Sequence, residues 1–185
     1  MAKNFQEKKI LRSNITKRVA LCAIFIALGL TLSYINPFAY FLIFGTKINP
    51  FAHLINAITG VLLGLGFAVT TALGIAILRF SFGIGTIHAF HGGISGAIVV
   101  GGISYFLRKR YPKFIEFSAL SEPIGTVFIG GTIAQIILPI ADISAMEGFL
   151  TYWSLFALSS IPGSIMGFLI LLALKRAGIT WEDFF

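Results

Sequence analysis

Long apolar stretches separated by short polar segments make up most of the chain from residue 17 onward. A helix needs roughly 17–25 apolar residues to cross the hydrocarbon core of a bilayer, and four of the stretches reach that length. We therefore expect an all-α integral membrane bundle that forms a single transmembrane domain over residues 1–185. The four long stretches are residues 17–35, 88–107, 119–140 and 151–174.

A further apolar block, residues 51–81, lies between the first two of these stretches. The block fits either one long tilted helix or a hairpin of two short helices. Gly64–Leu65–Gly66 supplies the backbone freedom that a tight turn requires. The hairpin interpretation gives spans at about 51–65 and 67–81, and a total of six spans.

The positions of the basic residues favour the hairpin. Lys and Arg are enriched on the cytoplasmic side of membrane helices, and 12 of the 14 in this chain form three clusters. Six spans place all three clusters and both chain ends in the cytoplasm, with residues 1–16 as a basic cytoplasmic segment. Five spans would separate the second cluster from the C-terminus. The clusters are Lys3, Lys8, Lys9, Arg12, Lys17 and Arg18; Arg108, Lys109, Arg110 and Lys113; and Lys175 and Arg176.

Composition supports a membrane protein. Of the 185 residues, 57% are hydrophobic and 11% are charged, whereas soluble domains carry about 25% charged residues. The net charge of +7 would suit a nucleic-acid partner, but the charges flank membrane helices and are not interleaved with aromatic residues. We therefore expect no nucleic-acid binding and a multi-pass location in the cell membrane.

Polar residues inside the spans are informative, because an unpaired polar group in hydrocarbon costs several kcal/mol. Asn49, His53 and Asn56 follow one another at i, i+4 and i+7, which places them on one face of the second span. Pro50 fits the first turn of that helix and makes Asn49 its expected N-cap. The stripe indicates either hydrogen bonds between helices or a polar cavity, and three polar groups in one line favour the cavity.

A second polar stripe begins the fourth span. His88, His91 and Ser95 stand at i, i+3 and i+7 in the glycine-rich run GTIHAFHGGISGA. Together with His53 they provide three imidazoles, which is a possible zinc set. No HExxH or CxxC run accompanies them, so we expect neither a metal site nor a cofactor.

Three further polar or aromatic residues lie toward the outer side of the membrane. Arg79, at the end of the third span, either reaches the interface or holds an anion such as a ligand group or Asp142. Gln135 lies in the outer half of the fifth span. Trp153 opens the sixth span, where it belongs either to an interfacial aromatic belt or to a pocket for a flat ligand.

Glu122 lies near the cytoplasmic end when positions are counted along the fifth span from residue 119. We expect a structural role there, in which Glu122 and Pro123 begin a helix. The carboxylate would then pair with Arg108, Lys109 or Lys175, or meet a cytoplasmic partner.

Two further features concern partners. Ala23 and Ala27 in the first span stand four residues apart, and small residues at this spacing let another helix pack closely. The chain contains no GxxxxGK[ST] run, so we expect no ATP hydrolysis by the chain itself. A small bundle with a polar lining and no energy source indicates a binding subunit rather than an enzyme.

Four runs of residues carry a resemblance to a known family. The chain resembles the substrate-binding (S) components of energy-coupling factor (ECF) vitamin transporters, most closely the ThiW type. It departs from the expected AFPGG run at one position, where His91 replaces proline. The runs are AIFIA at 23–27, NPFAHLINAITGVLLG at 49–64, RFSFGIGTIHAFHGGISGA at 79–97 and SEPIGT at 121–126.

The resemblance implies that the chain binds a vitamin precursor near the outer face and performs no chemistry. ThiW-type members are assigned to the thiazole precursor of thiamine, hydroxyethyl-methylthiazole. The implied partners are a transmembrane coupling protein, contacted through Ala23 and Ala27, and two cytoplasmic ATPases, all in a prokaryotic cell membrane. The alternatives are another vitamin, such as hydroxymethylpyrimidine or thiamine, a self-sufficient channel or carrier, or a histidine-based metal enzyme. The expected pocket residues are Asn49, His53, Asn56, Arg79, His88, His91, Gln135 and Trp153.

Overall fold

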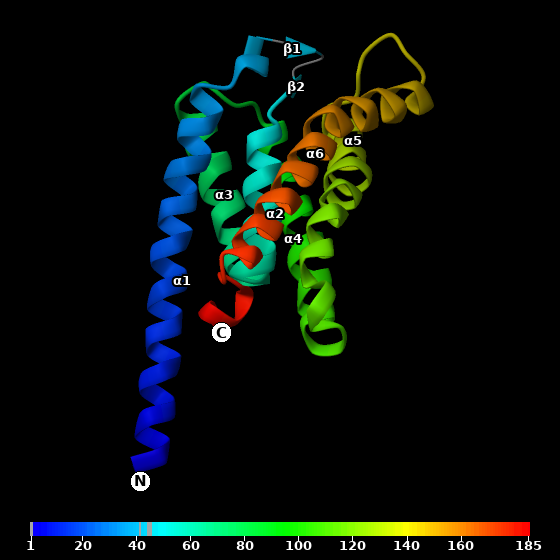
Figure 1. Cartoon of the computed structure of the whole chain (residues 1–185). Coiled ribbons are helices and arrows are strands. Elements are labelled where there is room, and N and C mark those ends of the chain that lie inside the picture. The colour runs from blue at the N-terminus through cyan, green and yellow to red at the C-terminus, as the bar shows by residue number, and fades with distance from the viewer. Residues whose placement is uncertain (1, 41, 44–45) are drawn as a thin grey trace.

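The computed structural model describes the backbone of residues 2–40, 42–43 and 46–185, and the side chains of residues 14–38 and 46–185. The chain forms a helical bundle with one short β-hairpin at the end opposite both termini (Figure 1). The elements are α1 (Ala2–Tyr34), η1 (Pro37–Tyr40), β1 (Leu42–Ile43), β2 (Thr46–Lys47), α2 (Pro50–Leu62), α3 (Leu65–Ser81), α4 (His88–Arg110), η2 (Pro112–Ser121), η3 (Ile124–Gly130), α5 (Gly131–Ile137), α6 (Ala145–Arg176) and η4 (Trp181–Phe184).

Four helical segments are long and apolar enough to cross a membrane, which confirms the all-α membrane fold. The other two, α2 and α3, have 13 and 17 residues. At 1.5 Å per residue they measure about 20 and 25 Å, less than a hydrocarbon core of about 30 Å. The count of six crossings therefore stays a prediction. The four long segments are Asn14–Tyr34, His88–Arg110, Pro112–Ile137 and Ala145–Arg176.

The hairpin expected within the apolar block is present. Helix α2 ends at Leu62 and α3 begins at Leu65, so the block is two helices rather than one. Gly64 makes the turn with φ of 84°, a left-handed conformation that glycine adopts without a steric penalty. Gly66 lies inside α3 and does not form part of the turn.

Helix α2 is the centre of the bundle. All of its residues except Phe51 are buried, and it packs against α1, α3, α4 and α6. Glycines on neighbouring helices permit this close approach: a Cβ atom at Gly167 would stand 2.6 Å from Cβ of Ala57. Because α2 is enclosed by protein, its polar stripe faces other helices instead of lipid.

The fifth span differs from the expectation. It starts at Pro112 instead of residue 119, and it consists of a 3₁₀ segment, a π segment and an α-helix in succession, η2, η3 and α5. Pro123 consequently lies in the middle of the span, where it is the N-cap residue of the π segment. A mid-span π segment is rare and is often found at functional sites.

The two terminal helices are longer than expected. Helix α1 continues through the basic N-terminal segment 1–16, which was expected to precede it. Helix α6 starts at Ala145, six residues before the expected start, because Ser144 and Glu147 form a capping box. Both termini and the C-terminal end of α6 lie at the lower end of Figure 1, with the β-hairpin at the opposite end. The basic residues at 175–176 are thus on the same side as the N-terminus.

Candidate ligand pocket

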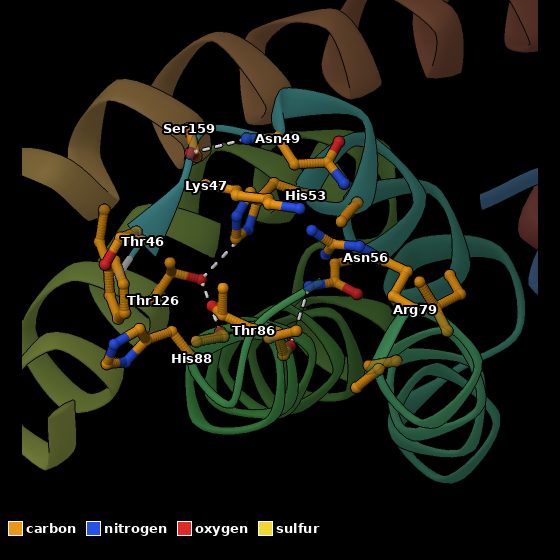
Figure 2. A pocket seen from close by; sticks show the side chains of 18 residues that line it. Thr46, Lys47, Asn49, His53, Asn56, Arg79, Thr86, His88, Thr126 and Ser159 are labelled. Atoms are coloured by element: carbon orange, nitrogen blue, oxygen red, sulfur yellow. Dashed lines mark hydrogen bonds between the residues drawn. The ribbon is translucent and has the colours of Figure 1, made fainter. Parts of the chain in front are cut away.

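A pocket opens at the end of the bundle that carries the β-hairpin. Its walls come from β2, the start of α2, the end of α3, the start of α4, η3 and α6 (Figure 2). The space inside it, counted together with the open solvent at its mouth, is about 550 Å³. The polar side chains that line it are Thr46, Lys47, Asn49, His53, Asn56, Arg79, Thr86, His88, Thr126 and Ser159.

The predicted stripe on α2 lines one side of this pocket. Asn49 occupies the expected N-cap position but makes no capping bond with its side chain. Its Nδ2 donates instead to Oγ of Ser33 at 2.7 Å, and its backbone N–H donates to Oγ of Ser159 at 3.0 Å. Asn56 is 1% exposed and donates to the carbonyl of Gly93 on α4 at 2.9 Å. The α2 stripe thus joins helices and lines a cavity at once.

Glu122 is placed differently from the sequence prediction. It is fully buried, and its Oε1 lies 2.7 Å from Nδ1 of His53, 2.7 Å from Oγ1 of Thr126 and 3.3 Å from Nδ2 of Asn56. The expected pairing with a basic residue at the cytoplasmic end is therefore wrong. Lys175 pairs with Glu116 instead, at 2.9 Å.

This contact determines which nitrogen of His53 is available. Oε1 of Glu122 accepts hydrogen bonds from the amide of Asn56 and the hydroxyl of Thr126. The contact with His53 is satisfied when Nδ1 carries the hydrogen, since a carboxylate only accepts. In the neutral ring, Nε2 is then the remaining acceptor. Glu122 does not line the pocket itself, but it orients a residue that does.

The same reasoning applies to His88 and His91. Nδ1 of His91 donates to the carbonyl of Gly130 at 3.1 Å, which leaves its Nε2 as an acceptor in the neutral ring. Nδ1 of His88 lies 3.2 Å from that Nε2 and therefore donates to it. His88 lines the pocket with its own Nε2 uncommitted in this chain of bonds, whereas His91 lies behind it.

Arg79 is buried, with 6% of its surface exposed, and it lines the pocket opposite His88 (Figure 2). It therefore does not reach an exposed interface. Among the described side chains, no carboxylate lies within ion-pair distance of it, and Asp142 is exposed. The turn after α3 folds back on it, with Gly85 N–H donating to the Arg79 carbonyl at 2.9 Å.

The two remaining predicted pocket residues lie outside this cavity. Nε1 of Trp153 donates to Oγ1 of Thr132 at 3.1 Å, and its ring packs against Phe128. Oε1 of Gln135 accepts from the backbone N–H of Ile140 at 3.4 Å. Both side chains connect the fifth span to α6 and the loop before it. The structure thus gathers five of the eight predicted residues around one cavity, and His91, Gln135 and Trp153 beside it.

The three histidines do not converge on a common point. His88 and His91 are in contact, while Nδ1 of His53 is occupied by Glu122. Within the described part of the chain, no group of three or more His, Cys, Asp or Glu side chains is arranged to hold a metal ion.

Several pocket residues were not identified from the sequence. Thr46 and Lys47 come from the β-hairpin, Thr126 from the π segment and Ser159 from α6. Lys47 could have been found from the sequence, because it and Arg79 are the only basic residues outside the three clusters that flank the spans. Threonine and serine carry no such signal, because they occur in membrane helices for many structural reasons.

Apolar helices around a pocket lined by polar side chains define a multi-pass membrane protein with a cavity near one end of its bundle. The sequence model of ThiW, described as a thiamine-precursor transporter protein, matches residues 19–177. The chain therefore belongs to the ThiW family, which is a family of small-molecule transporters. No curated protein and no solved structure matches the chain.

Proposed function

We propose that this chain is the substrate-binding component of an ECF-type importer and that it captures the thiazole precursor of thiamine. The observation that carries the proposal is a pocket with polar and aromatic lining in a member of a thiamine-precursor transporter family. The chain binds the precursor at the end of the bundle opposite its termini, and a coupling protein with two ATPases drives uptake. The chain itself catalyses no reaction.

The lining of the pocket supports a small heteroaromatic ligand. His53 and His88 offer acceptors, while Asn49, Thr86 and Ser159 offer amide and hydroxyl groups. Phe156, Ile75 and four alanines supply the apolar part of the wall. A thiazole ring with a hydroxyethyl arm needs this combination, because one part is flat and apolar and the other makes hydrogen bonds.

The binding prediction concerns purified protein in detergent. We expect a thiazole compound to bind at least about tenfold more tightly than hydroxymethylpyrimidine, thiamine or an unrelated vitamin such as biotin, a difference of about 1.4 kcal/mol. Isothermal titration calorimetry across these ligands measures it. Tighter binding of the pyrimidine or of thiamine would identify that compound, and not the thiazole, as the substrate. Failure of every thiamine-related compound to bind would refute the proposed function.

The outer face of α1 supports docking to a coupling protein. Ala23 and Ala27 are exposed on this helix, with Ile24 and Leu28 beside them. The stripe of small side chains makes a shallow groove into which another helix fits closely. Among the described side chains of α1, residues 14–34, none lines the pocket. Docking and ligand binding should therefore respond to different substitutions.

The docking prediction uses the double substitution Ala23→Leu and Ala27→Leu. Each added side chain fills the groove, and overpacking costs about 1–3 kcal/mol, so complex formation should fall at least about tenfold. Co-purification with the coupling protein and cellular uptake measure the loss, while ligand binding by the isolated chain should stay unchanged. Ala173→Leu, at an exposed site on α6, is the matched control. Normal assembly of the double variant would refute docking through this face.

A further inference from the structure

The guanidinium of Arg79 is a buried cation without a counterion. It is 6% exposed, its Nε has no hydrogen-bond partner, and no hydrogen bond or ion pair to its side chain exists among the described residues. The two buried glutamates are committed elsewhere, Glu122 to His53 and Glu116 to Lys175. An isolated buried charge is unfavourable unless it is paired, so a partner for Arg79 is expected.

Two other arginines have an unpaired Nε, and the comparison separates them from Arg79. The guanidinium of Arg18 lies 4.4 Å from the ring centre of Phe185, and that of Arg108 lies 3.7 Å from the same ring. Arg108 also donates to the carbonyl of Val61. These cations are stabilised by an aromatic face, whereas Arg79 has neither a ring nor a carbonyl partner within the described chain.

The surroundings of Arg79 concentrate positive charge in the pocket. Nζ of Lys47 donates to the carbonyl of Gly83 at 3.3 Å, in the same turn that folds over Arg79. Gly85 packs so closely on Arg79 that a Cβ atom there would stand 3.4 Å from its Nε. Lys47 and Arg79 both line the cavity, and no acidic side chain does so in the described structure. Figure 2 shows the Arg79 side chain directed into the cavity.

From this arrangement we infer that the ligand of this pocket is an anion: a small heteroaromatic molecule that carries a phosphate or carboxylate group. The inference rests on the proposed function and refines it. The guanidinium of Arg79 binds the anionic oxygens through its paired N–H groups, and Lys47 adds a second positive charge. His53 and His88 contact the remaining, neutral part of the ligand. Of the thiazole compounds, the phosphate ester or a carboxylated analogue would be the preferred form.

The test compares three probes on purified protein: hydroxyethyl-methylthiazole, its phosphate monoester and a carboxylated thiazole. We expect the anionic probes to bind at least about 30-fold more tightly than the alcohol, because losing one partner of a buried charged contact costs about 2 kcal/mol or more. In Arg79→Met this preference should disappear, because the affinity for the anionic probes falls to about that for the alcohol. Arg79→Lys should retain part of the preference.

Controls separate this inference from general loss of charge or fold. Arg110→Met makes the same change in net charge at an exposed position and should leave the preference intact. Binding of the alcohol by Arg79→Met shows that the pocket is formed. Should that variant fail to fold, Lys47→Met provides the second measurement. Its affinity for the anionic probes should fall about fivefold or more relative to its affinity for the alcohol.

The outcomes distinguish the two proposals. If the alcohol binds as tightly as the anionic probes, or Arg79→Met keeps the preference, the inference is refuted and the thiazole function stands. If none of the three probes binds, the proposed function fails. Competition by inorganic phosphate as strong as that by the ester, or loss of ester binding in nanodiscs with phosphatidylglycerol, would assign Arg79 to free phosphate or a lipid headgroup and overturn the inference.

Discussion

Replacing Gly125 by alanine is expected to prevent the fifth span from packing on α4. A Cβ atom at this position would stand 2.7 Å from the backbone carbon of Ser95 and 2.9 Å from Cα of Gly96, and closer still to the Ser95 carbonyl oxygen. These are backbone atoms of a helix, so no flexible side chain can move aside. The two spans must separate, and the contacts around Glu122 and Thr126 separate with them.

The expected cost of Gly125→Ala is about 3 kcal/mol, at the upper end for overpacking. For a chain of this size that lowers Tm by about 6–12 °C. Thermal unfolding in detergent, followed by size-exclusion chromatography, measures the change. Gly102→Ala in α4 is the matched control, because nothing lies within 4 Å of its added Cβ, and it should be neutral or stabilising by up to about 1 kcal/mol. Equal Tm values for the two variants would contradict the predicted clash.

Replacing Glu122 by alanine is the second substitution with a large expected effect. It removes the acceptor shared by His53, Asn56 and Thr126, all of them buried. Removing one partner of a buried pair costs about 3–5 kcal/mol, because the remaining groups are left without hydrogen bonds and without water. Ligand affinity should fall as well, since the orientation of His53 depends on this contact.

A matched pair of conservative variants tests this explanation. Glu122→Gln keeps the side-chain volume and one acceptor oxygen but removes the negative charge of the carboxylate. It should weaken ligand binding at least about tenfold. Glu116→Gln alters the ion pair with Lys175, whose side chain is 41% exposed, so screening limits the expected loss of stability to about 1 kcal/mol and ligand binding should not change. Equal effects of the two glutamine variants on binding would mean that Glu122 has no positioning role.

The misplacement of Glu122 shows where sequence reasoning failed. The span was expected to start at residue 119, where the long apolar stretch begins. In the structure the span begins at Pro112. With a rise of about 2.0 Å per residue in the 3₁₀ segment, Glu122 lies about 20 Å from that end of the span. The carboxylate thus comes within hydrogen-bond distance of His53 and Asn56, two pocket-lining residues from a helix more than 60 positions earlier.

The start of α6 was missed for a different reason. Ser144 and Glu147 form a capping box, which is a local sequence signal that apolar length alone does not reveal. The helix hairpin, by contrast, was predictable, because Gly64 is a local backbone requirement and the basic clusters restrict the topology.

The sequence by itself determined the membrane class, the boundaries of α2, α3 and α4 to within a few residues, the hairpin and the polar stripe of α2. These properties follow from the local composition of each segment and from the helical repeat of its polar and apolar positions, and both can be read within a single segment. Only the tertiary structure decided which polar residues share a cavity. His88 faces it and His91 does not, Trp153 turns away, and Lys47 and Thr126 enter it from distant segments. Such convergence depends on how the helices cross and where each one begins, and no single segment contains that information.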